Sequence, residues 1–293
     1  MIIFRDRAST VLYEVLSALD NHTKFLMPVN ICPVVPETFL KANIKFDFID
    51  INLKTLCMDE VLALKSIKND SSIGGVLFVN TFGVDIEVEE FFQKLKNINP
   101  DIFIIYDQCL SIQDFEFNPD ESLSSLALFS SGYSKYVDLG FGGYGFLKNN
   151  EFNETFKDNS KDKSFLDYKV NVKNEISLMQ KHKSKLNSIY KKGIPSYLHL
   201  GQEFENWRFS ILIDEKDKLL EAIFKEDDLF ASSHYEPLDH KYSDNPIINS
   251  NAKVISSRIV NLFNDFRFTD AKAKRVVKII NNFINDRRKL KPK

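Results

Sequence analysis

The chain has 293 residues, a formal net charge of −2, and 43% hydrophobic and 27% charged residues. These values are ordinary for a globular protein, and the length suffices for one large domain and a smaller one around a substantial core. The nearly balanced charge gives no reason to expect a nucleic acid or an anionic membrane as a partner, and the lack of a run of about 18 apolar residues predicts no transmembrane helix.

The N-terminal segment begins with a short strand or an arm at Ile2–Phe4. Residues 1–6 lack the basic start and apolar middle of a signal peptide. An apolar-periodic pattern after Arg7 predicts a helix, for which Ser9 or Thr10 is a natural N-cap. The same two hydroxyl groups could instead bind a phosphate together with the exposed N–H groups of the helix start.

Strands and helices then alternate through the first half of the chain. The second predicted strand is dense enough in aliphatic and aromatic residues to suggest burial on both faces. The alternation predicts a mostly parallel sheet with helices on both faces, in which right-handed crossovers place all strand ends at one edge. The strands are predicted at 24–29, 43–50, 75–81 and 101–107, with helices between them up to residues 42, 67 and 97.

The second half of the chain has a different pattern. Residues 151–163 are polar and suggest a flexible surface segment or linker. Apolar residues spaced among charges then predict a long helix at 173–190. We expect a smaller α+β domain beyond it, so that the chain divides into a large domain at 1–165 and a connecting helix with the smaller domain at 166–293. Its elements are predicted as a strand at 204–213 and helices at 214–224, 251–262 and 269–286, the last capped by Thr269.

The cysteines and histidines give little indication of a metal. Cys32, Cys57 and Cys109 lack the spacing of metal ligands, and the five histidines are scattered. An odd number of cysteines without a disulfide pattern is typical of reduced thiols. We therefore expect a cytoplasmic protein without a catalytic metal.

The most informative stretch runs from a predicted strand at 125–130 through Lys135 to a cluster of glycines at 140–145. Glycines at such a position allow a tight turn and a close approach to a ligand. Asp107 ends the preceding predicted strand. A lysine that forms a Schiff base and an aspartate that holds a pyridinium nitrogen are the two groups that pyridoxal phosphate chemistry requires. Taken alone, a lysine before a glycine turn is more often a solvated surface group.

Asp107 together with Ser130–Gly145 resembles the DegT/DnrJ/EryC1/StrS family of sugar aminotransferases. The family signature is a strand that ends in Asp, then a Phe-Ser pair, a Lys and a Gly-Gly turn, and the likeness extends from Arg7 to about Ile284. The resemblance implies the α/β fold type I aminotransferase architecture, with a mostly parallel sheet in the large domain and a smaller C-terminal α+β domain. It also implies a homodimer with its sites at the interface.

The resemblance also implies roles for individual residues. Lys135 would bind pyridoxal 5′-phosphate as a Schiff base and transfer protons, while Asp107 would hold the pyridinium nitrogen. His234 and Tyr235 would contact the substrate, although a single histidine in a loop is more often a packed or surface residue. Further cofactor contacts, chiefly to the phosphate, would come from Ala8, Ser9, Thr10, Asn30 and Ser130.

Some positions depart from the family pattern. Leu110 stands where relatives carry a Gln or His that bonds the ring hydroxyl of the cofactor. No aromatic residue that could stack on the ring occurs in Val29–Pro33. Asp167, Tyr168 and Lys169 stand where relatives carry Asn-Tyr-Arg, a motif whose asparagine reaches the site of the neighbouring subunit. These departures leave a changed reaction or a reduced activity open.

The implied activity is the transfer of an amino group, from glutamate as in relatives, to a keto group of a nucleotide-linked sugar. Such products enter the biosynthesis of surface polysaccharides or secondary metabolites. The substrates are therefore expected to be a nucleotide sugar and an amino-acid donor. One alternative is a lyase or transferase that uses the same cofactor on a small phosphorylated or amino-acid substrate. Another is a non-catalytic family member that acts as a binding partner.

Overall fold

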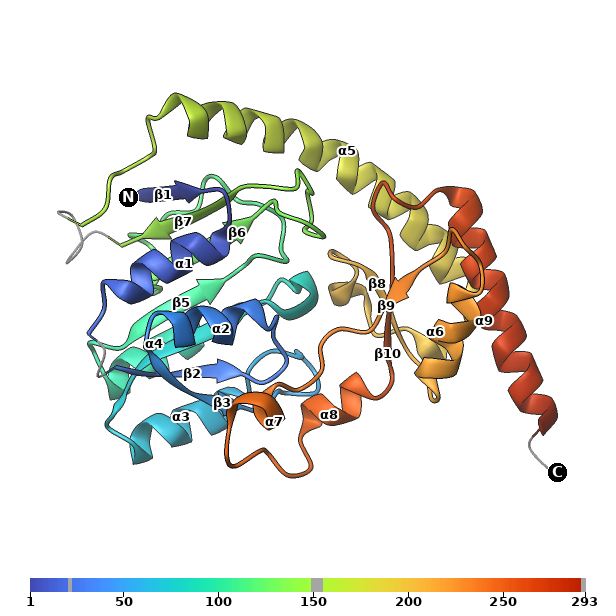
Figure 1. Cartoon of the computed structure of the whole chain (residues 1–293), viewed down its shortest axis with the longest axis horizontal. Coiled ribbons are helices and arrows are strands. Elements are labelled where there is room, and N and C mark those ends of the chain that lie inside the picture. The colour runs from blue at the N-terminus through green and yellow to red at the C-terminus, as the bar shows by residue number, and fades with distance from the viewer. Residues whose placement is uncertain (21–22, 149–154, 291–293) are drawn as a thin grey trace.

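The computed structural model describes residues 1–20, 23–148 and 155–290, with side chains described up to Asp286. A large sheet with helices on its faces and a smaller α+β part are joined by the long helix α5 (Lys163–Gly193), which spans the top of the view in Figure 1. Within these ranges, no helix combines the length and the apolar composition needed to cross a membrane.

The large sheet has seven strands in the order β1-β7-β6-β5-β4-β2-β3. The five strands from β2 to β6 pair in parallel, whereas β7 is antiparallel to both β6 and β1. The prediction of a mostly parallel sheet is thus confirmed. The strands are β1 (Ile2–Arg5), β2 (Lys24–Pro28), β3 (Lys45–Ile49), β4 (Ile73–Val79), β5 (Phe103–Asp107), β6 (Leu126–Ser130) and β7 (Gly143–Leu147).

Helices cover both faces of this sheet because its central strands bury alternate side chains on opposite sides. In β4, Leu77 and Val79 pack with α1 and α2, while Val76 and Phe78 pack with α3 and α4. Figure 1 shows α1 and α2 in front of the sheet. The four helices are α1 (Ala8–Ser17), α2 (Val34–Lys41), α3 (Glu60–Asn69) and α4 (Glu89–Ile98).

The expectation that the strand at 43–50 is buried on both faces is wrong. It forms β3, the edge strand of the sheet, and Lys45 and Asp47 are exposed there. Phe46 and Phe48 alternate with the exposed Lys45 and Asp47 and therefore lie on one face of the strand. Apolar density alone does not distinguish a central from an edge position, because that depends on strand order.

The C-terminal part is built on a three-stranded antiparallel sheet in the order β8-β10-β9. A separate apolar core lies between this sheet, the end of α5 and the terminal helix, and it includes Leu186, Ile211 and Val276. The α+β class predicted for this region is therefore confirmed. Its elements are β8 (Phe209–Leu212), α6 (Lys216–Phe224), β9 (Ala231–Ser232), α7 (Asp239–Tyr242), α8 (Asn251–Ser256), β10 (Ile259–Leu262) and α9 (Asp270–Leu290).

Several predicted boundaries differ from the structure. The helix expected at 251–262 ends at Ser256, and Ile259–Leu262 instead forms the central strand of the small sheet, where it is buried on both faces. The strand expected at 204–213 begins at Phe209, after a 3₁₀ turn at Gln202–Phe204. The long helix begins at Lys163 rather than 173 and so includes the end of the polar segment, of which residues 151–154 lie outside the described ranges. Thr269 does cap α9, since its hydroxyl accepts a hydrogen bond from Lys272 N at 3.3 Å.

Candidate active site

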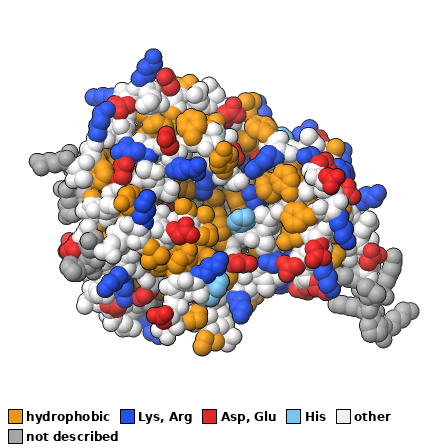
Figure 2. Space-filling view, viewed as in Figure 1, with side chains coloured by type: hydrophobic (Ala, Val, Ile, Leu, Met, Phe, Trp, Pro, Cys, Tyr) orange, Lys and Arg blue, Asp and Glu red, His pale blue; other side chains and the backbone are white. Residues whose placement is uncertain are grey.

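A cavity of about 280 Å³ opens at the edge of the sheet where its parallel strands end. Figure 2 shows that the molecule is hollowed between its two parts on this face, with hydrophobic side chains in the hollow. The volume is close to the lower end of the range for small-molecule sites. Its walls come from the start of α1, the start of α2 and the segments after β5 and β6, and are formed by Arg7, Ala8, Ser9, Leu12, Cys32, Val34, Val35, Thr38, Asp107, Cys109, Leu128, Ser130, Gly132, Tyr133 and Lys135.

Lys135 and Asp107 both line this cavity. Asp107 is the last residue of β5, is 7% exposed, and accepts a hydrogen bond from Cys109 N at 2.9 Å. Lys135 is half-buried, and its backbone N–H donates to Gly132 O at 3.3 Å. In the described part of the chain its ammonium group forms no ion pair or hydrogen bond, which leaves the amine available for a ligand.

The start of α1 forms the wall of the cavity next to Ser130. Arg7 occupies the N-cap position without a side-chain hydrogen bond to the helix, so Ser9 and Thr10 lie in the first turn instead of capping it. Ser9 and Ser130 line the cavity, whereas Thr10 is exposed and lies outside the lining. Unpaired N–H groups and the positive end of the helix dipole attract anions at such a helix start.

Gly143 allows this close placement of α1 on the sheet. A Cβ atom at Gly143 would lie 1.9 Å from Ala8 N, so every other residue type would push the helix start away. Gly142, with φ +94°, lies in the backbone region that favours glycine, and its carbonyl accepts a hydrogen bond from Ser131 N at 2.9 Å. The glycine cluster therefore sets the distance between the first turn of α1 and the end of β6.

The cavity residues fit pyridoxal phosphate. The start of α1 and the Ser9 and Ser130 hydroxyl groups suit a phosphate. The Asp107 carboxylate, at the end of β5, suits a protonated ring nitrogen. Lys135 contributes an uncommitted amine. This donor set is polar at a few points and apolar elsewhere, as small-molecule sites usually are.

Asn30 lies outside the cavity lining. It is 3% exposed, its Nδ2 donates to Leu56 O at 3.0 Å, and its Oδ1 has no hydrogen-bond partner among the described residues. Leu110 is also outside the lining, since its side chain is buried in the apolar core. Cys32, from the segment in which no stacking aromatic was found, lines the cavity, and Cys109 occupies a wall position that the sequence did not single out for this site.

His234 and Tyr235 approach the cavity from the C-terminal part. Burial lowers the pKa of His234 to about 4, with the positive charges of Arg208 and Lys135 contributing, and its Nδ1 has no partner among the described residues. The imidazole is therefore neutral at pH 7. Burial raises the pKa of the Tyr235 phenol, with Cys32 and Asp107 contributing. Neither residue lines the cavity itself, but both respond to the charges of its walls.

Sequence reasoning missed three hydrogen bonds at this site, of which the first two join the two parts of the molecule. Trp207 Nε1 donates to Ser134 O at 2.5 Å, and Arg267 Nη1 donates to Ser134 Oγ at 3.3 Å. Gln113 Nε2 donates to Ser130 O at 2.5 Å, while its buried Oε1 has no partner among the described residues. No local pattern marks these contacts, because each joins segments that are distant in the sequence.

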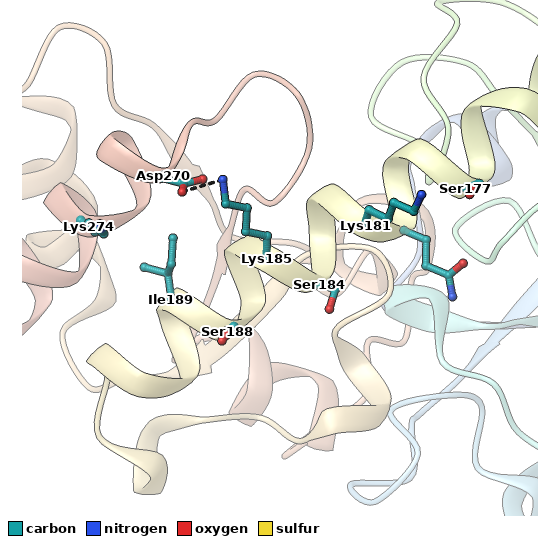
Figure 3. A pocket seen from close by; sticks show the side chains of 9 residues that line it. Ser177, Lys181, Ser184, Lys185, Ser188, Ile189, Asp270 and Lys274 are labelled. Atoms are coloured by element: carbon teal, nitrogen blue, oxygen red, sulfur yellow. Dashed lines mark ion pairs between the residues drawn. The ribbon is translucent and has the colours of Figure 1, made fainter.

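A wider depression of about 670 Å³ lies on the outer surface between α5 and α9. Figure 3 shows the lysine and serine side chains of α5 along it, with Lys185 turned toward Asp270, to which it pairs at 2.8 Å. Lys181 and Lys274 are the other charged residues of its lining. Solvated surface lysines of this kind do not define a chemistry, and we assign no site there.

Comparison with solved structures identifies the fold. A putative sugar aminotransferase from Streptococcus pneumoniae in its PMP form matches with a TM-score of 0.78 at 13% identity, over 97% of this chain and 88% of that chain. PseC from Helicobacter pylori, an aminotransferase involved in the biosynthesis of pseudoaminic acid, matches with a TM-score of 0.77 at 12% identity, over 97% and 87%. DesI, solved in the presence of its TDP-sugar product, matches with a TM-score of 0.77 at 13% identity, over 98% and 83%.

The class that these matches define is the fold of the pyridoxal-phosphate-dependent aminotransferases, and the predicted fold class is confirmed. Within it, this chain is similar to enzymes that are described as sugar aminotransferases. Neither a protein-family model nor a curated protein matches the sequence.

Proposed function

We propose that this protein is a pyridoxal-phosphate-dependent aminotransferase that transfers an amino group, from glutamate, to a keto group of a nucleotide-linked sugar. The observation that carries the proposal is the meeting of Lys135 and Asp107 in one cavity, with the first turn of α1 at its wall. When bound, the cofactor supplies an electron sink for the bonds at the donor α-carbon.

The residues that line the cavity would bind the cofactor, orient it and transfer protons. The start of α1, Ser9 and Ser130 would hold the phosphate and so orient the ring. The Asp107 carboxylate would keep the ring nitrogen protonated, and the Lys135 amine would hold the cofactor through its aldehyde carbon and move the proton at the donor α-carbon. His234 is a neutral hydrogen-bonding group on the substrate side, because its low pKa excludes an imidazolium at pH 7.

A sugar substrate is supported by the neighbouring structures, of which one holds a TDP-sugar product and another acts in pseudoaminic acid biosynthesis. The same likeness supports membership in the DegT/DnrJ/EryC1/StrS family and a role in surface polysaccharide or secondary-metabolite biosynthesis. From the sequence we further propose a cytoplasmic location, a cofactor-binding domain at 1–165 and a smaller domain from 166 onward. A homodimer is supported by the exposed side chains of Tyr133 and Phe141, which are 69% and 48% exposed on the loop that carries Lys135. A second copy would cover them.

A second function is favoured by one observation. Leu110 packs in the core, so the position that bonds the ring hydroxyl in relatives contributes nothing to this cavity. A bound cofactor ring would therefore lack this hydrogen bond, and a lyase or transferase reaction on a small phosphorylated or amino-acid substrate is the alternative. A non-catalytic binding protein is the third possibility, which a cofactor-free purified protein would support.

The test combines a visible spectrum with covalent trapping. Purified protein is mixed with pyridoxal phosphate, borohydride is added, and the modified lysine is identified by peptide mapping, beside Lys135→Ala and the control Lys181→Ala at an exposed position. We expect a visible band and a label at Lys135 in the wild type and in the control, and neither in Lys135→Ala. Equal labelling of all three proteins would refute the assignment of Lys135. Loss of the band on addition of glutamate, and its return with a keto sugar nucleotide, would then distinguish a transaminase from a lyase.

A further inference from the structure

Ser134, the residue immediately before Lys135, has an unusual backbone conformation. Its φ is 60°, in the left-handed region that is unfavourable for a residue with a Cβ atom. A non-glycine residue keeps such a conformation only where its surroundings determine it. The conformation of Ser134 sets the direction in which the chain, and therefore the Lys135 side chain, continues into the cavity wall.

Three hydrogen bonds determine this conformation. Ser134 N donates to Asp138 Oδ2 at 2.8 Å within the same loop. The other two come from the C-terminal part, where Trp207 Nε1 donates to Ser134 O at 2.5 Å and Arg267 Nη1 donates to Ser134 Oγ at 3.3 Å. Every polar group of Ser134 is therefore bonded, and its carbonyl oxygen is held by a residue that is 3% exposed.

Trp207 is itself firmly packed. Its ring is stacked with that of Tyr235 at 6.3 Å and 12° and lies 6.2 Å from that of Phe82. Its carbonyl oxygen accepts a hydrogen bond from Lys183 Nζ at 2.7 Å, and that buried amino group also donates to Asn264 Oδ1 at 2.8 Å. The indole N–H thus has little freedom to leave Ser134.

We propose that Trp207 is a positioning residue for Lys135: its indole N–H holds Ser134 in the left-handed conformation and thereby aims the lysine amine into the cavity. Because Tyr235 stacks on the same ring, the placement of the lysine depends on the placement of the C-terminal part. This inference rests on the proposed function, in which Lys135 bonds the cofactor aldehyde. The amine adds to the aldehyde carbon with loss of water, and borohydride then supplies the hydride that makes the C–N bond permanent.

The experiment distinguishes an effect on the placement of Lys135 from an effect on the other cofactor contacts. The rate at which borohydride-stable label accumulates on Lys135 is measured for Trp207→Phe, which keeps an aromatic ring but lacks the N–H. Affinity for pyridoxamine 5′-phosphate is measured in parallel, because this compound has no aldehyde and reports only the non-covalent contacts. We expect labelling to slow roughly fivefold to tenfold, as for one lost hydrogen bond, while the affinity changes by less than about twofold.

A matched pair at Ser134 tests the backbone conformation directly. Ser134→Gly and Ser134→Val both lose the hydroxyl group, but glycine accepts a positive φ and a β-branched residue does not. We expect Ser134→Gly to label Lys135 within about threefold of the wild type and Ser134→Val to label it at least about tenfold more slowly.

Three results would overturn the inference alone. These are wild-type labelling rates in Trp207→Phe, equal rates in the two Ser134 variants, and a fall in pyridoxamine phosphate affinity as large as the fall in labelling rate, which would indicate general damage. A wild-type protein that takes no label at Lys135 would instead overturn the proposed function and this inference with it.

Discussion

Asp50, at the end of β3, binds the backbone of Asn251, which starts α8. Its Oδ2 accepts a hydrogen bond from Asn251 N at 2.6 Å, and its Oδ1 accepts one from Ala252 N at 3.1 Å. The carboxylate is 8% exposed and so joins the sheet edge to the C-terminal half of the chain. A carboxylate at a helix start is favourable because it accepts hydrogen bonds from the unpaired N–H groups and is attracted by the positive end of the helix dipole.

Replacement of Asp50 by Asn is expected to lower the free energy of unfolding by about 1–3 kcal/mol, because an amide offers one acceptor oxygen where two buried N–H groups need partners. The measurement is urea denaturation followed by circular dichroism. Asp47→Asn on the same strand is the matched control. Asp47 is exposed and pairs with Lys24 at 2.9 Å, and its loss should cost less than about 1 kcal/mol. Equal losses in both variants would contradict a special role of Asp50.

Gly143→Ala is expected to destabilise the protein by about 3 kcal/mol or more. The new methyl group would overlap Ala8 N, and this backbone atom can move away only if the start of α1 moves with it. Thermal unfolding provides the measurement. Gly132→Ala, in the loop between β6 and β7, is the control, because a Cβ atom there meets only Ser130 Oγ at 3.4 Å. A Gly143→Ala protein with wild-type stability would show that α1 does not pack as described.

Lys183 should make stability depend on pH above neutrality. Burial lowers its pKa to about 7, so between pH 7 and 10.5 the unfolded chain binds a proton that the folded chain does not. Unfolding therefore becomes less favourable as pH rises, by up to about 1.4 kcal/mol per pH unit. Denaturation of the wild type and of Lys183→Met at several pH values isolates this contribution, because the other groups are common to both. Lys181→Met, an exposed position on the same helix, should keep the wild-type slope; a Lys183→Met protein that keeps it too would contradict the low pKa.

His234 should remain neutral down to about pH 4. Its folded pKa is below the unfolded value near 6.5, so the unfolded chain binds the extra proton between these limits, and stability falls as pH drops from 6.5 to 4. The imidazole resonances in a proton NMR titration, assigned by their loss in His234→Gln, give the pKa directly. A midpoint near 6.5 would mean that the side chain is more solvated than its burial indicates.

Most strands and helices around the large sheet could be predicted from the sequence, because the apolar residues of each follow a single pattern, either a continuous run or a helical repeat. The strand that ends in Asp107 and the run that ends in Ser130 are continuous apolar stretches, and parallel topology then brings their ends together. The glycines at 142 and 143 indicated a tight turn, but the sequence did not show that the start of α1 packs directly against Gly143. For these reasons the sequence placed Lys135 and Asp107 near one another.

The C-terminal part was less predictable for physical reasons. Ile259, Val260 and Leu262 follow a short helix directly, and their apolar spacing suits a helix as well as a strand, so only pairing with β8 and β9 decides the outcome. The bond from Trp207 to Ser134 joins residues 73 positions apart. Such contacts carry no local signal in the sequence, because the two partners lie in segments that are brought together only by the fold.

The dependence of Ser134 on Trp207 and Arg267 also sets an order of events during synthesis. All seven strands of the large sheet precede residue 148, so that sheet emerges from the ribosome while both donors are still to be translated. Until Trp207 has left the exit tunnel, the loop that carries Lys135 lacks two of the three hydrogen bonds of Ser134, and until Arg267 has left it the loop still lacks one. Capture of the cofactor by the nascent chain is therefore expected to follow translation of the last strand of the small sheet.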